Sequence, residues 1–217
     1  MRRRVIFSFI MGGLVAAALA LTRSQVSAQS VPAPCDFITG GGFIFRPDDG
    51  ARANFGAHGG CKNGDFWGHV NYVDHGGFEG ATPFHVDSVE ITGYLMDEDI
   101  PNARDICGFA RTNTGETHVR FRVRMVDNGE GSNATAKDRF GIRVATTPEY
   151  LVPTQPLGDD DPGGGNVKLH KHNNSNTSPC TGPDDPACLE SELCGGLETP
   201  DAGPTCGPIC CGPNCGD

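Results

Sequence analysis

The chain has 217 residues, of which 31 are glycine and 16 are proline, and it carries a formal net charge of −10. Glycine is about twice as frequent as in ordinary proteins, whereas glycine and proline together stay below the content of wholly disordered chains. This composition leaves room for one modest globular domain and some irregular sequence. The acidic balance argues against a nucleic-acid partner, because phosphate binding needs clustered lysine and arginine.

The N-terminus has the pattern of a secretory signal peptide. Three arginines at positions 2–4 precede an apolar run over 5–21, and Val26 and Ala28 occupy the −3 and −1 positions of a cleavage site. We expect cleavage near Ala28 and export to the periplasm, the cell surface or the medium, with no membrane span in the remaining chain. An uncleaved anchor is the alternative, because the apolar run is nearly long enough to cross a bilayer. Removing residues 1–28 removes four arginines and no acid, which leaves a net charge of −14.

Strands are predicted along the middle of the chain, because apolar and polar residues alternate with a period of two and no segment has helix periodicity. In chain order the predicted strands cover 37–45, 51–57, 66–73, 88–95, 105–111, 117–127, 139–144 and 167–170. In 66–73 both alternating sets contain large apolar residues, which suggests a strand covered on both sides. In 88–95 the set that contains Val89 and Leu95 is expected to face the core.

A hairpin is predicted where Asp127-Asn128-Gly129 follows the strand over 117–127, with residues 128–137 as its loop. The outward face of that strand carries His118, Arg120, Arg122 and Arg124. We interpret this basic stripe as a solvated face paired with acids on neighbouring strands. About eight short strands separated by turn residues predict an all-β fold, either an antiparallel β-sandwich or an open barrel.

The mature chain divides into a short segment over 29–34, a β-sandwich domain over 35–170, a polar linker over 171–179 and an acidic tail over 180–217. The tail contains too little apolar material to form a core, so cross-links or a metal would have to order it. Ten cysteines in an exported protein indicate disulfides. Three lie in the domain and seven in the tail, so at least one bridge joins the two regions, or each region keeps an odd thiol. The cysteines are Cys35, Cys61, Cys107, Cys180, Cys188, Cys194, Cys206, Cys210, Cys211 and Cys215.

Several glycine-rich and aromatic segments of the domain resemble the post-COAP domain of bacterial secreted and surface proteins. They are 35–44 (CDFITGGGFI), 53–56 (ANFG), 59–69 (GGCKNGDFWGH), 72–75 (YVDH), 127–130 (DNGE), 138–140 (DRF) and 163–170 (GGGNVKLH). The resemblance spans residues 35–170 and implies a β-rich accessory module without catalytic residues to carry over. Within this region Cys35 and Cys61 could close a loop of about 25 residues, which would leave Cys107 as the odd thiol, either buried or paired with the tail.

Four histidines and one aspartate are close in sequence: His58, His69, Asp74, His75 and His85. Imidazole and carboxylate groups at this density could bind Zn²⁺, with His69, Asp74 and His75 as the ligand set. Turn and sheet-pairing roles are the alternative, since the spacing matches no zinc motif.

Acidic clusters offer oxygen ligands for Ca²⁺ at 97–99, at Asp127 with Glu130, and at 159–161. None of these clusters has the EF-hand pattern, so we interpret them as solvated turns and expect no cofactor. Trp67 and Tyr72, near Phe66, could form an aromatic platform for sugar rings, although packing in the core is the alternative.

These patterns predict an exported, non-catalytic structural or binding module whose ligand is an unidentified glycan or protein at a surface. The alternative is a small metal-dependent hydrolase that uses the histidine and aspartate cluster. No nucleophile elbow or zinc-protease motif is present in the sequence.

Overall fold

The computed structural model describes residues 29–130, 136–159, 164–172 and 180. Ten strands and no helix are present in these ranges, which confirms the predicted all-β class. The strands are β1 (Gln29–Ser30), β2 (Phe37–Phe45), β3 (Arg52–Lys62), β4 (Asp65–Asp74), β5 (Phe84–Asp97), β6 (Ala103–Thr112), β7 (Val119–Val126), β8 (Arg139–Val144), β9 (Tyr150–Pro156) and β10 (Gly165–His170). The signal peptide, most of the linker and all the tail except Cys180 lie outside the described residues.

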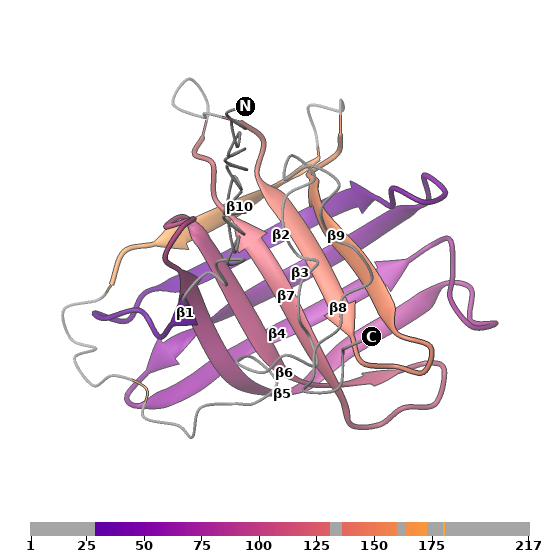
Figure 1. Ribbon diagram of the computed structural model, residues 1–217, viewed down its shortest axis with the longest axis horizontal. Helices are drawn as coiled ribbons and strands as arrows, with labels where there is room; N and C mark the ends of the chain where they lie inside the picture. The colour runs from indigo at the N-terminus through magenta and orange to yellow at the C-terminus, as the bar shows by residue number, and fades with distance from the viewer. Residues whose placement is uncertain (1–28, 131–135, 160–163, 173–179, 181–217) are drawn as a thin grey trace, which may run out of the picture.

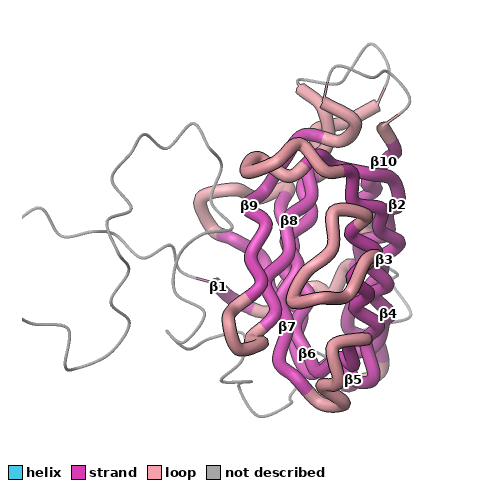
Figure 2. The backbone as a smooth tube through the Cα atoms, turned by 90° about the vertical axis from the view of Figure 1, so that its right-hand side faces the viewer, coloured by secondary structure: helices cyan, strands magenta, loops and turns pink. Residues whose placement is uncertain are grey.

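The strands form one antiparallel sheet in the order β10-β2-β3-β4-β5-β6-β7-β8-β9, and β1 pairs with β5 beside this path. The sheet curls back on itself like half a barrel, so that β10 to β4 face β6 to β9 (Figures 1 and 2). Of the two predicted architectures the open barrel therefore describes the fold better, because a single sheet supplies both layers. The predicted hairpin is confirmed, since β7 and β8 pair directly.

The last strand of the domain returns to the first long strand and holds the two ends of the curl together. β10 pairs with β2 over six residues, from Gly165↔Gly42 to His170↔Phe37. The loop after β9 adds backbone hydrogen bonds to Phe43, whose N–H donates to Gly164 and whose carbonyl accepts from Gly158. A Cβ at Gly42 would lie 2.3 Å from the Gly164 carbonyl oxygen, so only glycine allows this close approach.

The core lies between the two halves of the curl and is built from the inward side chains of nearly every strand. Phe55 on β3 and Phe140 on β8 stack across it with ring centroids 3.9 Å apart. Their neighbours are fully buried aliphatic and aromatic residues. Burial of each such side chain contributes about 1.5–3 kcal/mol to the free energy of unfolding. The largest of them are Tyr72, Tyr94, Phe84, Phe121, Ile38, Ile44, Ile106, Met125 and Ile142.

Two predictions about individual strands are wrong. In β5, register shifts between Ser88 and Glu90 and between Ile91 and Gly93 interrupt the alternation. As a result Val89 is 48% exposed and Tyr94 is fully buried, because each bulge changes which residues face the core. β4 is buried on one face only, since His69 and Asn71 on its other face are exposed. β9 was not predicted.

Of the two alternatives for the cysteines, the structure shows a bridge between domain and tail, because Cys61 near the end of β3 forms a disulfide with Cys180. The suggested Cys35–Cys61 bridge is wrong for this structure, in which Cys35 is a buried free thiol. Cys107 is buried, as one of its two expected states requires, and it is disulfide-bonded rather than free. No helix in the described ranges is long and apolar enough to span a membrane.

Candidate functional site

A row of rings crosses the outer surface of the first half of the sheet. His170 on β10 pairs with Phe37 on β2, Phe37 pairs with Gly60, and Gly60 pairs with Trp67 on β4. The His170 and Phe37 rings stack with centroids 4.3 Å apart and planes 6° apart. Phe37 and Trp67 lie 5.9 Å apart at 48°. Three strands distant in sequence thus contribute to one line of rings.

Gly60 explains how two large rings come so close on either side of one strand. A Cβ at this position would lie 2.6 Å from Cβ of Phe37 and 3.1 Å from the carbonyl oxygen of Asp36. No real side chain tolerates the first of these distances without movement of a neighbour. The absence of a side chain at Gly60 therefore lets Phe37 and Trp67 meet above the strand.

A second row runs beside the rings and carries polar groups. Thr39, His58 and His69 are successive cross-strand partners on β2, β3 and β4. The His58 ring lies 5.6 Å from Trp67 and 6.3 Å from His69. We call the outward side chains of these two rows the aromatic face; its six members are His170, Phe37, Trp67, Thr39, His58 and His69.

Hydrogen bonds fix the outer members of the aromatic face. The Thr39 hydroxyl and Nε2 of His170 are hydrogen-bonded at 2.9 Å. Nδ1 of His69 lies 3.1 Å from the Ser88 hydroxyl, and its Nε2 lies 3.3 Å from the Asp87 carboxylate. Burial, together with the nearby His69, lowers the pKa of His58, so the neutral imidazole is favoured there.

The aromatic face is open to solvent, with His69 exposed and its five other members half-buried. The next row of the sheet carries Gly41 and Gly56, and a Cβ at Gly56 would meet no atom within 4 Å. This glycine strip leaves a shallow path along the rings, bordered by the exposed amide of Asn71. Chemically, the surface offers flat apolar rings beside hydrogen-bonding groups that can both donate and accept.

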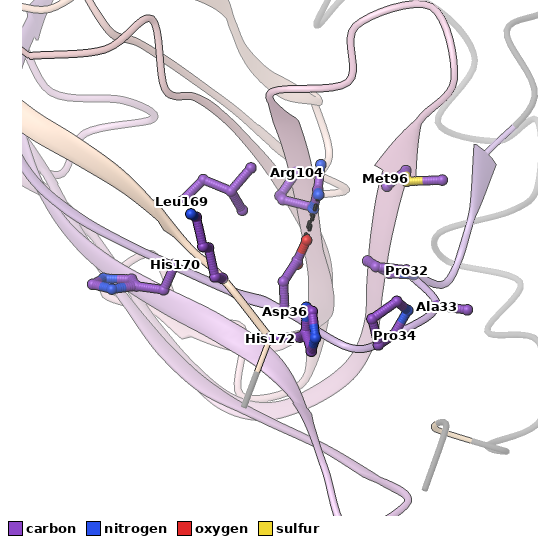
Figure 3. Close-up of a pocket in the computed structure, with 10 residues that line it drawn as sticks. Pro32, Ala33, Pro34, Asp36, Met96, Arg104, Leu169, His170 and His172 are labelled. Atoms are coloured by element: carbon purple, nitrogen blue, oxygen red, sulfur yellow. Dashed lines mark hydrogen bonds and ion pairs between the residues drawn. The ribbon is translucent and has the colours of Figure 1, made fainter. Parts of the chain in front are cut away.

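A pocket of about 350 Å³ lies close to His170, at the C-terminal end of β10. Its wall includes Pro34, Met96, His170 and His172, and an ion pair between Asp36 and Arg104 crosses it (Figure 3). The size is at the small end of ligand pockets. His170 belongs to both the pocket lining and the ring row, so the two features are adjacent.

The three predicted zinc ligands do not form one site. His69 lies on the outer surface, His75 is exposed just beyond β4, and Asp74 is fully buried. Among the described residues, the one group of side chains close enough to hold a metal ion consists of three cysteines. Strand geometry puts Asp74 on the face opposite to His69, because residues an odd number of positions apart point to opposite faces. His75 follows the last residue of β4, six positions along the chain from His69.

Asp74 instead anchors a polar network inside the curl. Its Oδ2 accepts hydrogen bonds from Arg46 at 2.6 Å and from the Tyr150 hydroxyl at 2.8 Å. The hydroxyls of Tyr150 and Tyr72 lie 2.7 Å apart, and burial raises the pKa of both phenols. Tyr72 is fully buried in the core, so its predicted place on a sugar platform is wrong.

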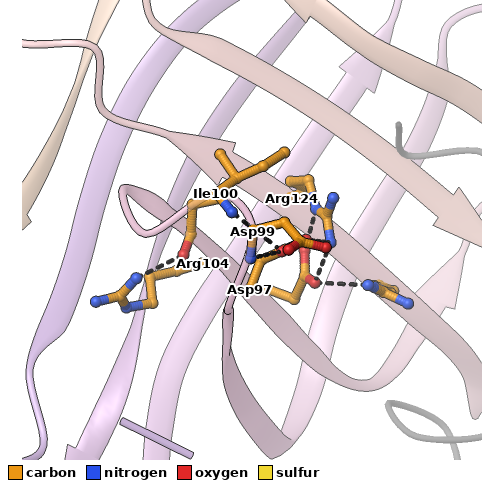
Figure 4. Close-up of polar contacts among 8 residues, drawn as sticks. Asp97, Asp99, Ile100, Arg104 and Arg124 are labelled. Atoms are coloured by element: carbon orange, nitrogen blue, oxygen red, sulfur yellow. Dashed lines mark hydrogen bonds and ion pairs between the residues drawn. The ribbon is translucent and has the colours of Figure 1, made fainter. Parts of the chain in front are cut away.

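The acidic clusters mostly stabilise turns and pair with arginines. Oδ1 of Asp97 accepts from the N–H groups of Asp99 and Ile100, and its Oδ2 pairs with Arg124 at 3.0 Å (Figure 4). Asp127 accepts from the N–H groups of Gly129 and Leu169. Asp159 ends a turn, and residues 160 and 161 lie outside the described ranges.

In the basic stripe the predicted pairing with acids is confirmed at Arg122 and Arg124, whose side chains are largely buried rather than solvated, whereas His118 is exposed. Asp105 on β6 receives two hydrogen bonds of 2.9 Å from Arg124 and one of 2.5 Å from Arg122. Burial alone would raise the pKa of Asp105, but the two arginines lower it to about 2. These charges hold neighbouring strands together and are unavailable to a ligand.

Of the predicted sugar platform, Trp67 alone lies on the open surface. Sequence reasoning missed Phe37, His170 and Thr39, which complete the aromatic face. From the alternation, Phe37 and Thr39 could have been placed on the outer face of their strand, because Ile38 between them faces the core. Their alignment with Trp67 depends on strand register. The register that aligns His170 with Phe37 pairs β10 with β2, two strands that are more than a hundred residues apart in the sequence.

Comparison of the chain with protein-family models, with curated proteins and with solved structures found no match. The function is therefore inferred from the arrangement of the residues themselves.

Proposed function

We propose that the protein is an exported, non-catalytic binding module that holds a carbohydrate on the aromatic face. The observation that carries this proposal is the row of rings formed by His170, Phe37 and Trp67 on an open sheet surface. Exposed aromatic groups gathered in one place are a marker of a binding surface in a soluble protein.

A carbohydrate suits this surface better than an apolar partner does. A sugar ring has a C–H face that can lie on an aromatic ring and a rim of hydroxyls that needs hydrogen bonds. Adjacent rows of the aromatic face supply both kinds of contact, because His58 lies beside Trp67 and His69 lies beside His58. The neutral imidazole favoured at His58 can both donate and accept a hydrogen bond. The glycine strip leaves room for an extended chain of sugars.

The remaining features of the chain agree with a module that acts outside the cytoplasm. The Cys61–Cys180 bridge suits an oxidising compartment, and the signal-like N-terminus supplies a route to it. The β-rich domain supports the resemblance to the post-COAP family, which we retain as part of the proposal. No observation favours the hydrolase alternative, since His69, Asp74 and His75 lie apart.

The proposal is tested by retention of residues 29–217 on insoluble cellulose, chitin, xylan and bacterial cell-wall polysaccharide. We expect at least one of these to retain the protein, and both Trp67→Ala and Phe37→Ala to abolish retention. The matched control is Phe109→Ala, because Phe109 also stacks on a histidine, His118, but lies on β6 in the other half of the sheet. No retention of the wild type on any of the four, or equal retention of Trp67→Ala, would contradict the proposal.

A further inference from the structure

Three buried sulfur atoms meet where β2 begins and β3 ends. Those of Cys35, Cys61 and Cys180 all lie within 4.8 Å of one another. Cys61 and Cys180 are bonded, whereas Cys35 is a free thiol. A free thiol therefore lies against a disulfide inside an apolar cluster that also contains Val31 and Phe66.

The sheet positions two of the three sulfurs and leaves the third on a separate segment. Phe37 pairs with Gly60 at the start of β2, which places Cys35 and Cys61 near the ends of adjacent strands. Cys180 is separated from the last strand by residues 171–179 of the chain. The closeness of Cys35 and Cys61 thus follows from strand register, whereas Cys180 is held to the domain by its disulfide and its packing in the cluster.

We propose that these three cysteines form a thiol–disulfide exchange site in which Cys35 replaces Cys180 as the partner of Cys61. The Cys35 thiolate attacks Sγ of Cys61, the bond between Cys61 and Cys180 breaks, and Cys180 leaves as a thiolate. Cys180 then takes up a proton equivalent to the one that Cys35 lost. One disulfide and one thiol are present before and after the step, so no oxidant or reductant is required.

The exchange moves the free thiol from the domain to the C-terminal segment. Before the step the thiol is buried at Cys35, and after it the thiol belongs to Cys180. The segment that follows carries six further cysteines, so the released thiol joins the Cys-rich tail: Cys188, Cys194, Cys206, Cys210, Cys211 and Cys215. Attack on Cys61 is favoured over attack on Cys180, because the new bond then joins two positions that the sheet already holds together.

Disulfide mapping of the mature full chain tests this proposal independently of any carbohydrate. The protein is incubated at pH 6 and pH 8.5 with a chelator and without added thiol or oxidant, then denatured in acid. Its free thiols are alkylated with N-ethylmaleimide, and its peptides are analysed without reduction. We expect both Cys61–Cys180 and Cys35–Cys61 peptides, with alkylation at Cys35 and at Cys180, and a faster approach to the final ratio at pH 8.5. The rate rises with pH because the thiolate is the attacking species.

A single connectivity at both pH values, with alkylation of one of the two cysteines alone, would overturn the proposal. Two variants serve as controls. Cys35→Ser should keep only the Cys61–Cys180 bridge and show no alkylation at Cys180. Cys180→Ser, produced in an oxidising compartment that supplies the two-electron oxidant for a new disulfide, should form the Cys35–Cys61 bridge. Free thiols at both positions in this variant would also overturn the proposal.

Discussion

The outer surfaces of the two halves of the sheet have opposite characters. Over β10 to β4 the outward residues include rings, histidines and a glycine strip that solvent reaches. Over β5 to β7 the outward residues include Asp97, Asp105 and Arg124, and all three are buried. Both halves have outward polar residues in alternation with core residues, so the alternation alone does not distinguish them.

The two halves also differ in what packs on their outer surfaces. The N-terminal segment lies on the second half, where β1 pairs with the end of β5 and Val31 packs against Leu95 and Cys107. The buried charges on this half pair with one another, because an isolated buried charge is costly. No described segment covers the aromatic face in this way, so its rings stay available. A polar residue at an outward position is therefore no guarantee of exposure.

The largest expected effect comes from substitution of Asp105, the buried carboxylate on β6 in the second half of the sheet. Asp105 is 1% exposed between Arg122 and Arg124, so Asp105→Asn removes the anion that the two guanidinium groups share, while Arg124 keeps its ion pair with Asp97. We expect the free energy of unfolding in urea to fall by about 3–5 kcal/mol. The control is Asp87→Asn, whose partner Arg111 is 66% exposed, with an expected change of about 0–1 kcal/mol. Equal effects of the two variants would show that the burial of Asp105 and its partners does not set the size of the loss.

The same carboxylate predicts how stability changes in acid. The pKa of Asp105 is near 2 in the folded protein and near 4 in an unfolded chain. Its contribution is therefore complete above pH 4 and is lost as the pH falls towards 2, by about 2 kcal/mol in total. Unfolding curves between pH 6 and pH 2 should show a steeper loss for the wild type than for Asp105→Asn. Parallel pH profiles would contradict this assignment.

A smaller effect is expected within the open half, from two glycines on the same face of β3. Gly60→Ala places a methyl group against Phe37. We expect the free energy of unfolding to fall by an amount near the lower limit of the range of about 1–3 kcal/mol. Gly56→Ala meets open space and should change stability by no more than about 0.5 kcal/mol. Urea denaturation measures both variants, and an altered Trp67 emission in Gly60→Ala alone would locate the disturbance in the ring row.

The smallest predicted effect concerns the titration of His58. Burial and His69 lower its pKa, so the unfolded chain binds this proton more readily and stability declines slightly as the pH falls through about 6.5. An NMR titration should place the His58 midpoint below that of a free histidine. His69→Asn should raise the midpoint, and an unchanged value would mean that the two imidazoles do not interact.

The fold was largely predictable from alternation, and its exceptions have physical causes. The strand over 37–45 has the predicted bounds, and the strands over 119–126 and 139–144 form the expected hairpin. β9 was missed because Pro153 and Pro156 interrupt its pattern and prolines are rare inside sheets. The bulges of β5 leave no comparable signal, so the burial of Tyr94 in place of Val89 could not be foreseen.

The candidate site was only partly predictable. Trp67 and Tyr72 are five positions apart on one strand, so alternation itself implies that both cannot lie on one face. The line of His170, Phe37 and Trp67 needed the register of three strands, which the sequence of each strand alone does not specify. The disulfide partner of Cys61 was likewise undetermined, because cysteine spacing does not define connectivity.

The central claim is that the aromatic face is where the ligand binds, and Trp67 reports on it directly because it is the only tryptophan in the chain. The most direct measurement is a titration of its fluorescence with soluble oligosaccharides of whichever polysaccharide retains the protein. We predict a saturable change in emission that is lost in Phe37→Ala and kept in Phe109→Ala. Binding of the sugar, detected by calorimetry, without any change in Trp67 emission would contradict the account.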